Sequence, residues 1–292
     1  MEPYLPNYLK GKNRRLVFDL LRERGQMSRA EITRDTGMSF PTAMKVVDAF
    51  LEKGLLVELD ETGPAAGAGR KGRLLRFEPG AYRAVGVECE GRFARVGLAD
   101  MAGGVQARET IELGDFARTR DLSPLAAAIR RMCAAANGAP VLGVCIGFPA
   151  NLDPDAAAIV SYAAMDIQQP TSFAQVFPAF WREVELPVYL ENDANLACEG
   201  EAFLRRGAGG AANMLYLSIG SGCGGAVRLD GKLRRGARCR AGEVGAMLLQ
   251  PALGAPGRSA ARETLEDAVC LAALERRFGA ALRDGAQPGE AS

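Results

Sequence analysis

The feature that most constrains the fold is a strand, a tight glycine turn and a second strand, a pattern that occurs twice in this 292-residue chain. Residues 84–98 read AVGVECEGRFARVGL, and residues 213–233 read NMLYLSIGSGCGGAVRLDGKL. Each stretch alternates apolar and other residues on both sides of its glycines, as a β-hairpin requires. Because α/β units lie around these hairpins, we predict a duplicated, two-lobed α/β body with a cleft between the lobes.

Further elements follow from the periodicity between and around the two hairpins. A third strand is expected near residues 110–113, and VLGVCIGFP (141–149) is expected to be a buried strand. A strand and turn are expected in PVYLENDAN (187–195). The helices expected in this part of the chain cover residues 125–136, 173–184 and 196–204.

The first 54 residues have a different pattern, which predicts three short helices. Residues 13–24 (NRRLVFDLLRER) carry leucines at helical spacing. Ser28 with Glu31 three residues later is a capping-box arrangement for a second helix. Ser39 can cap a third helix in residues 40–53, where a proline is tolerated in the first turn. Helices this short, with the glycine turn at Gly37, predict a helix-turn-helix.

Residues 55–77 complete this module as a two-stranded wing. Leu55, Val57 and Leu59 alternate, a GPAAGAG tip follows, and RKGRLLRF (70–77) returns. The expected winged helix-turn-helix domain covers residues 1–78.

The formal net charge is only +1, so charge points to a nucleic-acid partner only locally. Residues 10–34 hold eight Lys/Arg against three Asp/Glu, and residues 62–77 hold four basic residues and no acid. Basic surfaces at both ends of such a module suit contact with DNA phosphates, and the start of the third helix would meet base edges. The residues expected to face DNA are Ser39, Pro41, Thr42, Lys45, Arg70, Lys71 and Arg73. The alternative is an arginine-rich three-helix module that binds a protein.

Composition narrows the chemistry further. The chain has no histidine, which removes the commonest general base and the commonest zinc ligand. Its seven cysteines are scattered and form no CxxC pair, which favours reduced thiols over a disulfide framework. With no apolar leader at the start and no spanning apolar run, a soluble cytoplasmic protein is expected. Neither a metal nor a cofactor is expected.

Three segments together resemble the ROK family of bacterial repressors, open reading frames and sugar kinases. They are LSIGSGCGGAVRLDGKLRRGARCRAGEVGAM (217–247), ENDAN (191–195) and GVCIGFPANLD (143–153). The winged helix in front resembles ROK repressors specifically, and the resemblance runs from about residue 12 to residue 270. It implies an actin/hexokinase-like (ribonuclease H-like) body with a first lobe in residues 82–206 and a second in residues 207–292.

The resemblance also implies a sugar site. Asn192 and Asp193 would hydrogen-bond sugar hydroxyls, as would Glu243 and, on a weaker alignment, Glu266. In the kinases of the family the residue at the position of Asp193 is also the general base. The alternative for Asn192 and Asp193 is a plain helix N-cap. The glycine turn GSGCGG (220–225) would cradle a phosphate with its N–H groups or be a hairpin without a ligand.

The sequence departs from the family pattern at three places. Glu88-Cys89-Glu90-Gly91-Arg92 stands where the kinases have Asp-x-Gly-Gly-Thr, so a carboxylate replaces a phosphate-facing glycine. Arg92 is expected to pair with Glu88 or Glu90. Ala246 replaces the family's histidine, and the CxCxxC cluster is missing, which argues against zinc. The expected second lobe is shorter than the family's, without the strand and helix that hold adenosine.

These observations predict a sequence-specific DNA-binding regulator, by resemblance a repressor, rather than an enzyme. Its expected partners are double-stranded operator DNA, a sugar or sugar phosphate effector and a second copy of the chain. One alternative is a ligand-independent DNA-binding or oligomerisation protein with a vestigial pocket. The other is an ATP-dependent sugar kinase with Asp193 as base.

Overall fold

The computed structural model describes residues 5–62, 73–205, 212–249 and 263–283. The chain forms two compact units, one of residues 1–85, 97–108 and 132–142 and the other of residues 86–96, 109–131 and 143–292. No helix within the described ranges is long and apolar enough to cross a membrane.

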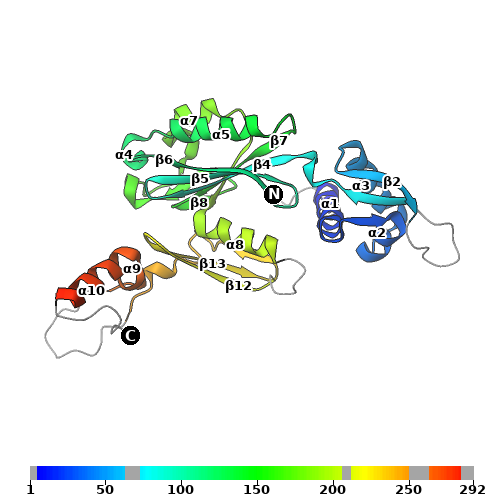
Figure 1. The fold of residues 1–292 in the computed structure, drawn as a ribbon. Helices are drawn as coiled ribbons and strands as arrows, with labels where there is room; N and C mark the ends of the chain where they lie inside the picture. The colour runs from blue at the N-terminus through cyan, green and yellow to red at the C-terminus, as the bar shows by residue number, and fades with distance from the viewer. Residues whose placement is uncertain (1–4, 63–72, 206–211, 250–262, 284–292) are drawn as a thin grey trace. The chain divides into compact units, whose positions relative to one another are not determined.

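The first unit begins with three helices, α1 (Leu5–Arg24), α2 (Arg29–Thr36) and α3 (Phe40–Glu52) (Figure 1). The capping box before α2 is confirmed, since Ser28 Oγ accepts from the Glu31 N–H and the Glu31 carboxylate accepts from the Ser28 N–H. Gly37 ends α2 at φ 66°, a left-handed conformation that favours glycine. Ser39 occupies the N-cap position of α3, but its hydroxyl bonds the Thr42 hydroxyl instead of a backbone N–H.

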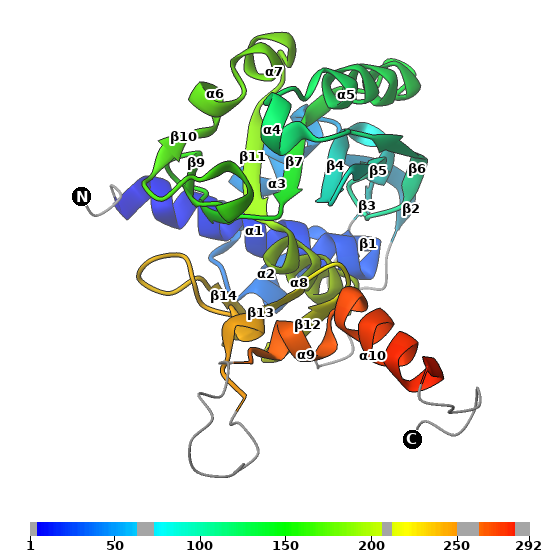
Figure 2. The ribbon, with the colours of Figure 1, turned by 90° about the vertical axis from the view of Figure 1, so that its left-hand side faces the viewer.

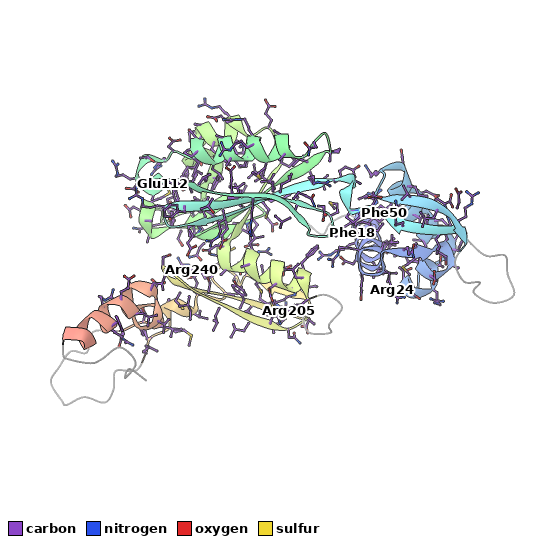
Figure 3. The ribbon with its side chains drawn as sticks, viewed as in Figure 1. Phe18, Arg24, Phe50, Glu112, Arg205 and Arg240 are labelled. Carbon is purple, nitrogen blue, oxygen red and sulfur yellow. The ribbon has the colours of Figure 1, made fainter. Side chains whose placement is uncertain are left out.

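A three-stranded antiparallel sheet in the order β1-β3-β2 accompanies these helices. The expected wing strands are β2 (Leu56–Thr62) and β3 (Arg73–Phe77), whereas the short β1 (Gln26–Ser28) was not expected. The tip between β2 and β3, with Arg70 and Lys71, lies outside the described residues. Helices and sheet share an apolar core (Figure 3) made of Val17, Leu21, Met27, Ile32, Val46, Val47, Phe50, Leu56, Leu75 and Phe77.

A five-stranded mixed sheet has the order β11-β7-β4-β5-β6. Its strands are β4 (Arg83–Glu90), β5 (Phe93–Asp100), β6 (Val105–Glu112), β7 (Val141–Phe148) and β11 (Val188–Asn192). Strand β7 is buried along most of its length, as its apolar sequence predicts, and β11 pairs with it in parallel. The carboxyl ends of β7 and β11 therefore meet at one edge of the sheet.

Short helices cover one face of this sheet, as Figures 1 and 2 show. They are α4 (Phe116–Thr119), α5 (Ser123–Ala135), α6 (Phe173–Val176) and α7 (Pro178–Glu183). The single helix expected over residues 173–184 is wrong, because it breaks at Phe177. A residue before proline is pushed out of the helical region, and Phe177 has φ −125° and ψ 64° ahead of Pro178. The Phe177 ring still packs against Phe148 and Phe173, with centroids 5.8 and 4.8 Å away.

A small sheet in the order β10-β9-β8 follows β7. It consists of β8 (Asn151–Asp153), β9 (Ala158–Ser161) and β10 (Thr171–Ser172).

The second hairpin forms a separate sheet in the order β12-β13-β14, against which α8 (Asp193–Leu204) packs (Figure 1). Its strands are β12 (Met214–Ile219), β13 (Cys223–Leu229) and β14 (Lys232–Arg234). The 3₁₀ turn η3 (Val244–Ala246) and helices α9 (Leu265–Val269) and α10 (Leu271–Arg283) follow. Within the described residues β12 is an edge strand, and its Leu215, Leu217 and Ile219 are 51–62% exposed.

We predict that Ser28→Ala lowers the free energy of opening of α2 by about 1 kcal/mol, the usual worth of an N-cap. Ser28 is 4% exposed and satisfies the N–H of Glu31, which alanine cannot do. Hydrogen exchange of the α2 amides measures this local free energy. Glu31→Gln is the matched control, because glutamine keeps an acceptor for the Ser28 N–H. Unchanged protection in Ser28→Ala would contradict the capping role.

Candidate functional site

A cavity of about 960 Å³ lies within the second unit. Its walls come from the end of β4, the segments that follow β7, β9 and β11, the glycine turn after β12, the segment before η3, and α9. Four residues expected to bind a sugar line this one cavity, namely Asn192, Asp193, Glu243 and Glu266.

Asn192 and Asp193 reach the cavity because β11 ends beside β7. Asn192 pairs in register with Phe148, the last residue of β7, and its Nδ2 donates to the Ala150 carbonyl at 3.3 Å. A Cβ at Gly147 would lie 3.1 Å from Leu196 Cδ2 and 3.4 Å from the Asp193 Cα, so the start of α8 packs directly against β7 at this glycine. Asn192 also caps α8, since its Oδ1 accepts from the Asn195 N–H at 3.1 Å. The N-cap interpretation therefore holds for Asn192, which lines the cavity as well.

Glu191, which is only 7% exposed, anchors the junction between β11 and α8. Its Oε1 accepts from the Asn192 N–H at 3.0 Å and from Asn195 Nδ2 at 3.1 Å. Its Oε2 accepts from Arg235 Nε at 2.9 Å and from Arg235 Nη2. The bond to Glu191 raises the pKa of Arg235, which follows β14. Sequence reasoning assigned no role to either residue, although a carboxylate directly after the apolar residues of a strand was a visible signal.

Asp193 lies in the first turn of α8, where its Oδ1 accepts from the Ala194 N–H at 2.8 Å. Burial is the main cause that raises the pKa of the Asp193 carboxyl, and the charges of Glu88 and Glu90 raise it further. The backbone N–H groups of Ala194 and of Asp193 itself oppose this shift. The net direction means that the folded protein holds this carboxylate at an energetic cost, as ligand-binding residues often are held.

Glu243 is positioned by close backbone approach at the glycines around it. A Cβ at Gly242 would lie 2.3 Å from the Gly225 carbonyl oxygen, and one at Gly245 would lie 2.0 Å from that of Cys223. Only glycine permits this contact with β13, and Gly242 also has φ 94°. Burial raises the pKa of Glu243, the Arg240 charge lowers it, and the nearby Asp193 and Glu266 charges raise it. Arg240 (Figure 3) donates to Ser161 Oγ at 3.3 Å.

Glu266 lies over the glycine turn between β12 and β13. Its Oε2 accepts from the Cys223 N–H at 2.8 Å, and a Cβ at Gly222 would come within 2.9 Å of the same oxygen. The turn N–H that was a candidate for holding phosphate is thus bound to a carboxylate of the protein.

Glu88 and Glu90 face the cavity from the first hairpin. Arg95 of β5 bridges them, with Nε 2.8 Å from Glu88 Oε2 and Nη2 2.7 Å from Glu90 Oε2. The expected pairing of Arg92 with these carboxylates is wrong, because Arg92 pairs with Glu112 at 3.2 Å. Alternation along β5 explains this difference. Phe93 and Arg95 lie on the same exposed face of the hairpin as Glu88 and Glu90, whereas Arg92 lies in the turn.

The residues expected to face DNA that the structure describes lie at the start of α3 and on β3. Ser39, Pro41 and Lys45 are exposed, and Thr42 is half-buried. Arg73 is exposed and lies 3.5 Å from Glu58, which moderates its charge. Sequence reasoning did not single out Phe40, whose side chain is 57% exposed in the first turn of α3.

Within the described ranges no group of three or more Cys, Asp or Glu side chains is arranged to hold a metal ion. Cys223 and Cys270 are buried and Cys239 is half-buried, each as a free thiol.

The fold and this cavity define a mixed α/β protein of the actin/hexokinase type, and the sequence model of the ROK family matches residues 84–288. The chain belongs to the ROK family. It is 27% identical over 241 residues to the xylose repressor of Caldicellulosiruptor bescii, which covers 81% of this chain and 58% of that protein. It is 34% identical over 141 residues to the glucokinase of Halalkalibacterium halodurans, which covers 46% of this chain and 40% of that protein.

Among solved structures, a ROK family transcriptional regulator described as a homologue of the E. coli MLC protein superposes with a TM-score of 0.74. The match covers 96% of this chain and 69% of that chain, at 19% sequence identity. The matched part of the chain spans less than two thirds of the length of the xylose repressor and of the glucokinase. Both regulators of transcription and sugar kinases occur among its relatives.

We predict that Asp193→Asn raises the unfolding temperature at neutral pH. Unfolding returns the raised pKa of the Asp193 carboxyl to its ordinary value. At pH values between the ordinary and the raised pKa, the native state therefore binds more protons than the unfolded state. The wild type therefore loses stability as pH rises through that window. Asparagine removes this loss, so the two melting curves should converge below the usual carboxyl pKa.

Calorimetry across the acid range measures this effect, with Glu185→Gln as an exposed carboxylate control outside the cavity. A lower unfolding temperature for Asp193→Asn at neutral pH would contradict the energetic cost assigned to the ionised Asp193 carboxylate in the folded protein.

Proposed function

We propose that this protein is a DNA-binding ROK regulator, most simply a repressor, whose cavity binds a sugar effector. The observation that carries the proposal is the module of α1, α2, α3 and the β2–β3 hairpin ahead of the ROK body. Its connectivity and its capped, glycine-turned helices suit a winged helix-turn-helix. Residues 1–78 would form the DNA-binding domain, and residues 82–206 and 207–292 the two lobes of the body.

The pattern of similarity supports this proposal. The match to the xylose repressor covers 81% of the chain, more than residues 84–292 contain, so it extends into the N-terminal module. The match to the glucokinase covers only 46% of the chain. A regulator also needs two recognition helices about 34 Å apart on operator DNA, which favours a homodimer.

On DNA, the first turn of α3 would enter the major groove. Thr42 would meet base edges, Lys45 a phosphate or guanine, and Arg73 with Arg70 and Lys71 a neighbouring phosphate run. Ser39 and Pro41 would fix the entry of the helix.

In the cavity, Asn192, Asp193, Glu243 and Glu266 would hold sugar hydroxyls. Carboxylates each accept from two hydroxyls, and an amide both donates and accepts, so the set suits a polyol. A ligand regulates DNA binding only if its affinity differs between the arrangement of the protein that can bind DNA and the arrangement that cannot. This difference in binding free energy is typically about 1–3 kcal/mol.

The kinase alternative, with Asp193 as base, is disfavoured by the glycine turn. Glu266 already binds the Cys223 N–H, and a Cβ at Gly220 would lie 3.1 Å from Glu90 Oε1. Phosphoryl transfer depends on positioning and charge neutralisation, and carboxylates at this turn oppose both.

We predict that Lys45→Ala weakens binding to a selected operator about tenfold and reduces the salt slope by about one, as loss of one phosphate contact does. The operator is first selected from a random duplex pool with the full chain, and affinity is then measured by anisotropy at several salt concentrations. Lys232→Ala, an exposed lysine in the body, is the matched control. Equal losses in both variants would argue against α3 as the DNA-facing helix.

We further predict that Asp193→Ala abolishes the response of operator binding to a sugar while leaving binding itself intact. The wild type should release operator DNA in the presence of one sugar from a panel. A complex indifferent to every sugar would favour the alternative of a vestigial pocket. Sugar-dependent ADP formation in a coupled assay with the same panel would favour the kinase alternative.

A further inference from the structure

The charge of the cavity lining carries an inference about which sugars enter. Six carboxylates line the cavity, whereas Arg240 is the single cation among the lining residues that the structure describes. The carboxylates are those of Glu88, Glu90, Asp166, Asp193, Glu243 and Glu266. Such an excess of one sign in a concave, partly buried site attracts cations and repels anions.

The neighbouring cations do not cancel this excess. Arg95 is shared between Glu88 and Glu90, so that group keeps one net negative charge. Arg235 forms an ion pair with Glu191 and does not line the cavity. Among the described lining side chains Arg240 is the cation that could receive an anion, and its charge already acts to lower the pKa of Glu243.

Two N–H groups of the glycine turn, the place best built for a phosphate, already have partners within the protein. In a glycine turn the backbone N–H groups form the anion site. Here the Cys223 N–H donates to Glu266 Oε2 at 2.8 Å, and the Gly220 N–H donates to the Gly222 carbonyl at 2.9 Å. A phosphate bound at the Cys223 N–H would have to displace a charge-assisted hydrogen bond and would then lie beside the displaced carboxylate of Glu266.

We infer that the cavity selects its sugar by charge: it binds an unphosphorylated sugar, binds the corresponding amino sugar more tightly, and rejects the sugar phosphate. This inference rests on the proposed sugar-binding function and specifies its ligand class. It removes sugar phosphates from the candidate effectors.

The test compares ligands that differ only at one carbon. Titration calorimetry of the full chain uses glucose, 6-amino-6-deoxyglucose and glucose 6-phosphate, and the same three forms of galactose and of mannose. We expect the phosphate to bind about 100-fold more weakly than its neutral parent, and the protonated amine about tenfold more tightly. Both ratios should shrink when the ionic strength is raised, because salt screens partly exposed charges.

A variant ties the selectivity to the cavity. Glu90→Gln removes one charge while Arg95 keeps Glu88 as its partner. It should raise the affinity for the phosphate relative to the neutral parent about tenfold, which corresponds to about 1.4 kcal/mol. The matched control is Glu185→Gln, which removes an exposed carboxylate outside the cavity lining and should leave the ratio unchanged.

The outcomes separate this inference from the function on which it rests. A sugar phosphate that binds as tightly as its neutral parent overturns charge selection and leaves sugar sensing standing. An equal ratio in Glu90→Gln and wild type overturns the role of the cavity carboxylates. If none of the nine ligands binds, both the sugar-sensing function and the inference fail.

Discussion

The candidate site depends on one ion pair, between the buried carboxylate of Glu191 and the guanidinium of Arg235, whose side chain is 41% exposed. A carboxylate that is 7% exposed is costly to bury unless its oxygens are satisfied, and here both oxygens accept hydrogen bonds. These bonds join three separate pieces of chain: the end of β11, the first turn of α8 and the segment that follows β14. Removing Arg235 would leave a buried charge unpaired, which costs far more than an exposed pair is worth.

Backbone contact does the rest of the positioning. Gly147 lets α8 start against β7, while Gly242 and Gly245 let the segment that carries Glu243 lie against β13. Gly242 and Gly245 leave no room for a Cβ, so these two glycines fix where the carboxylate of Glu243 lies. The charge of Asp193 raises the pKa of Glu243, and the charges of Glu88 and Glu90 raise that of Asp193, so the protein maintains an electrostatically unfavourable arrangement that a ligand rich in hydroxyls or carrying a positive charge would relieve.

Some local signals, in which one short segment contains the whole interaction, were read correctly from the sequence. The capping box of Ser28 and Glu31 and the strand β7 follow from residues a few positions apart. Pro178 should have warned of the break at Phe177, because its effect is also local. Periodicity gave no sign of β1, which exists only because β3 returns to pair with it.

Contacts between distant segments were outside the reach of sequence reasoning. That Arg95 rather than Arg92 neutralises Glu88 depends on the strand register, and the Arg235–Glu191 pair joins residues 44 positions apart. The bond from the Cys223 N–H to Glu266 spans 43 positions. Family resemblance predicted that one sugar site contains Asn192, Asp193, Glu243 and Glu266. It did not predict the hydrogen bonds that these residues make within the protein.

The absence of histidine from all 292 residues has a consequence for the acid response of the protein. Histidine is the one side chain whose ordinary pKa lies near neutrality, so this chain has no such group on its surface or in its core. Among the described residues, the carboxyls whose pKa is displaced toward neutrality are Asp193 and Glu243, and both line the cavity. These two carboxylates therefore take up protons at a higher pH than they would in the unfolded chain, and the occupant of the cavity competes with protons for the same two oxygen pairs.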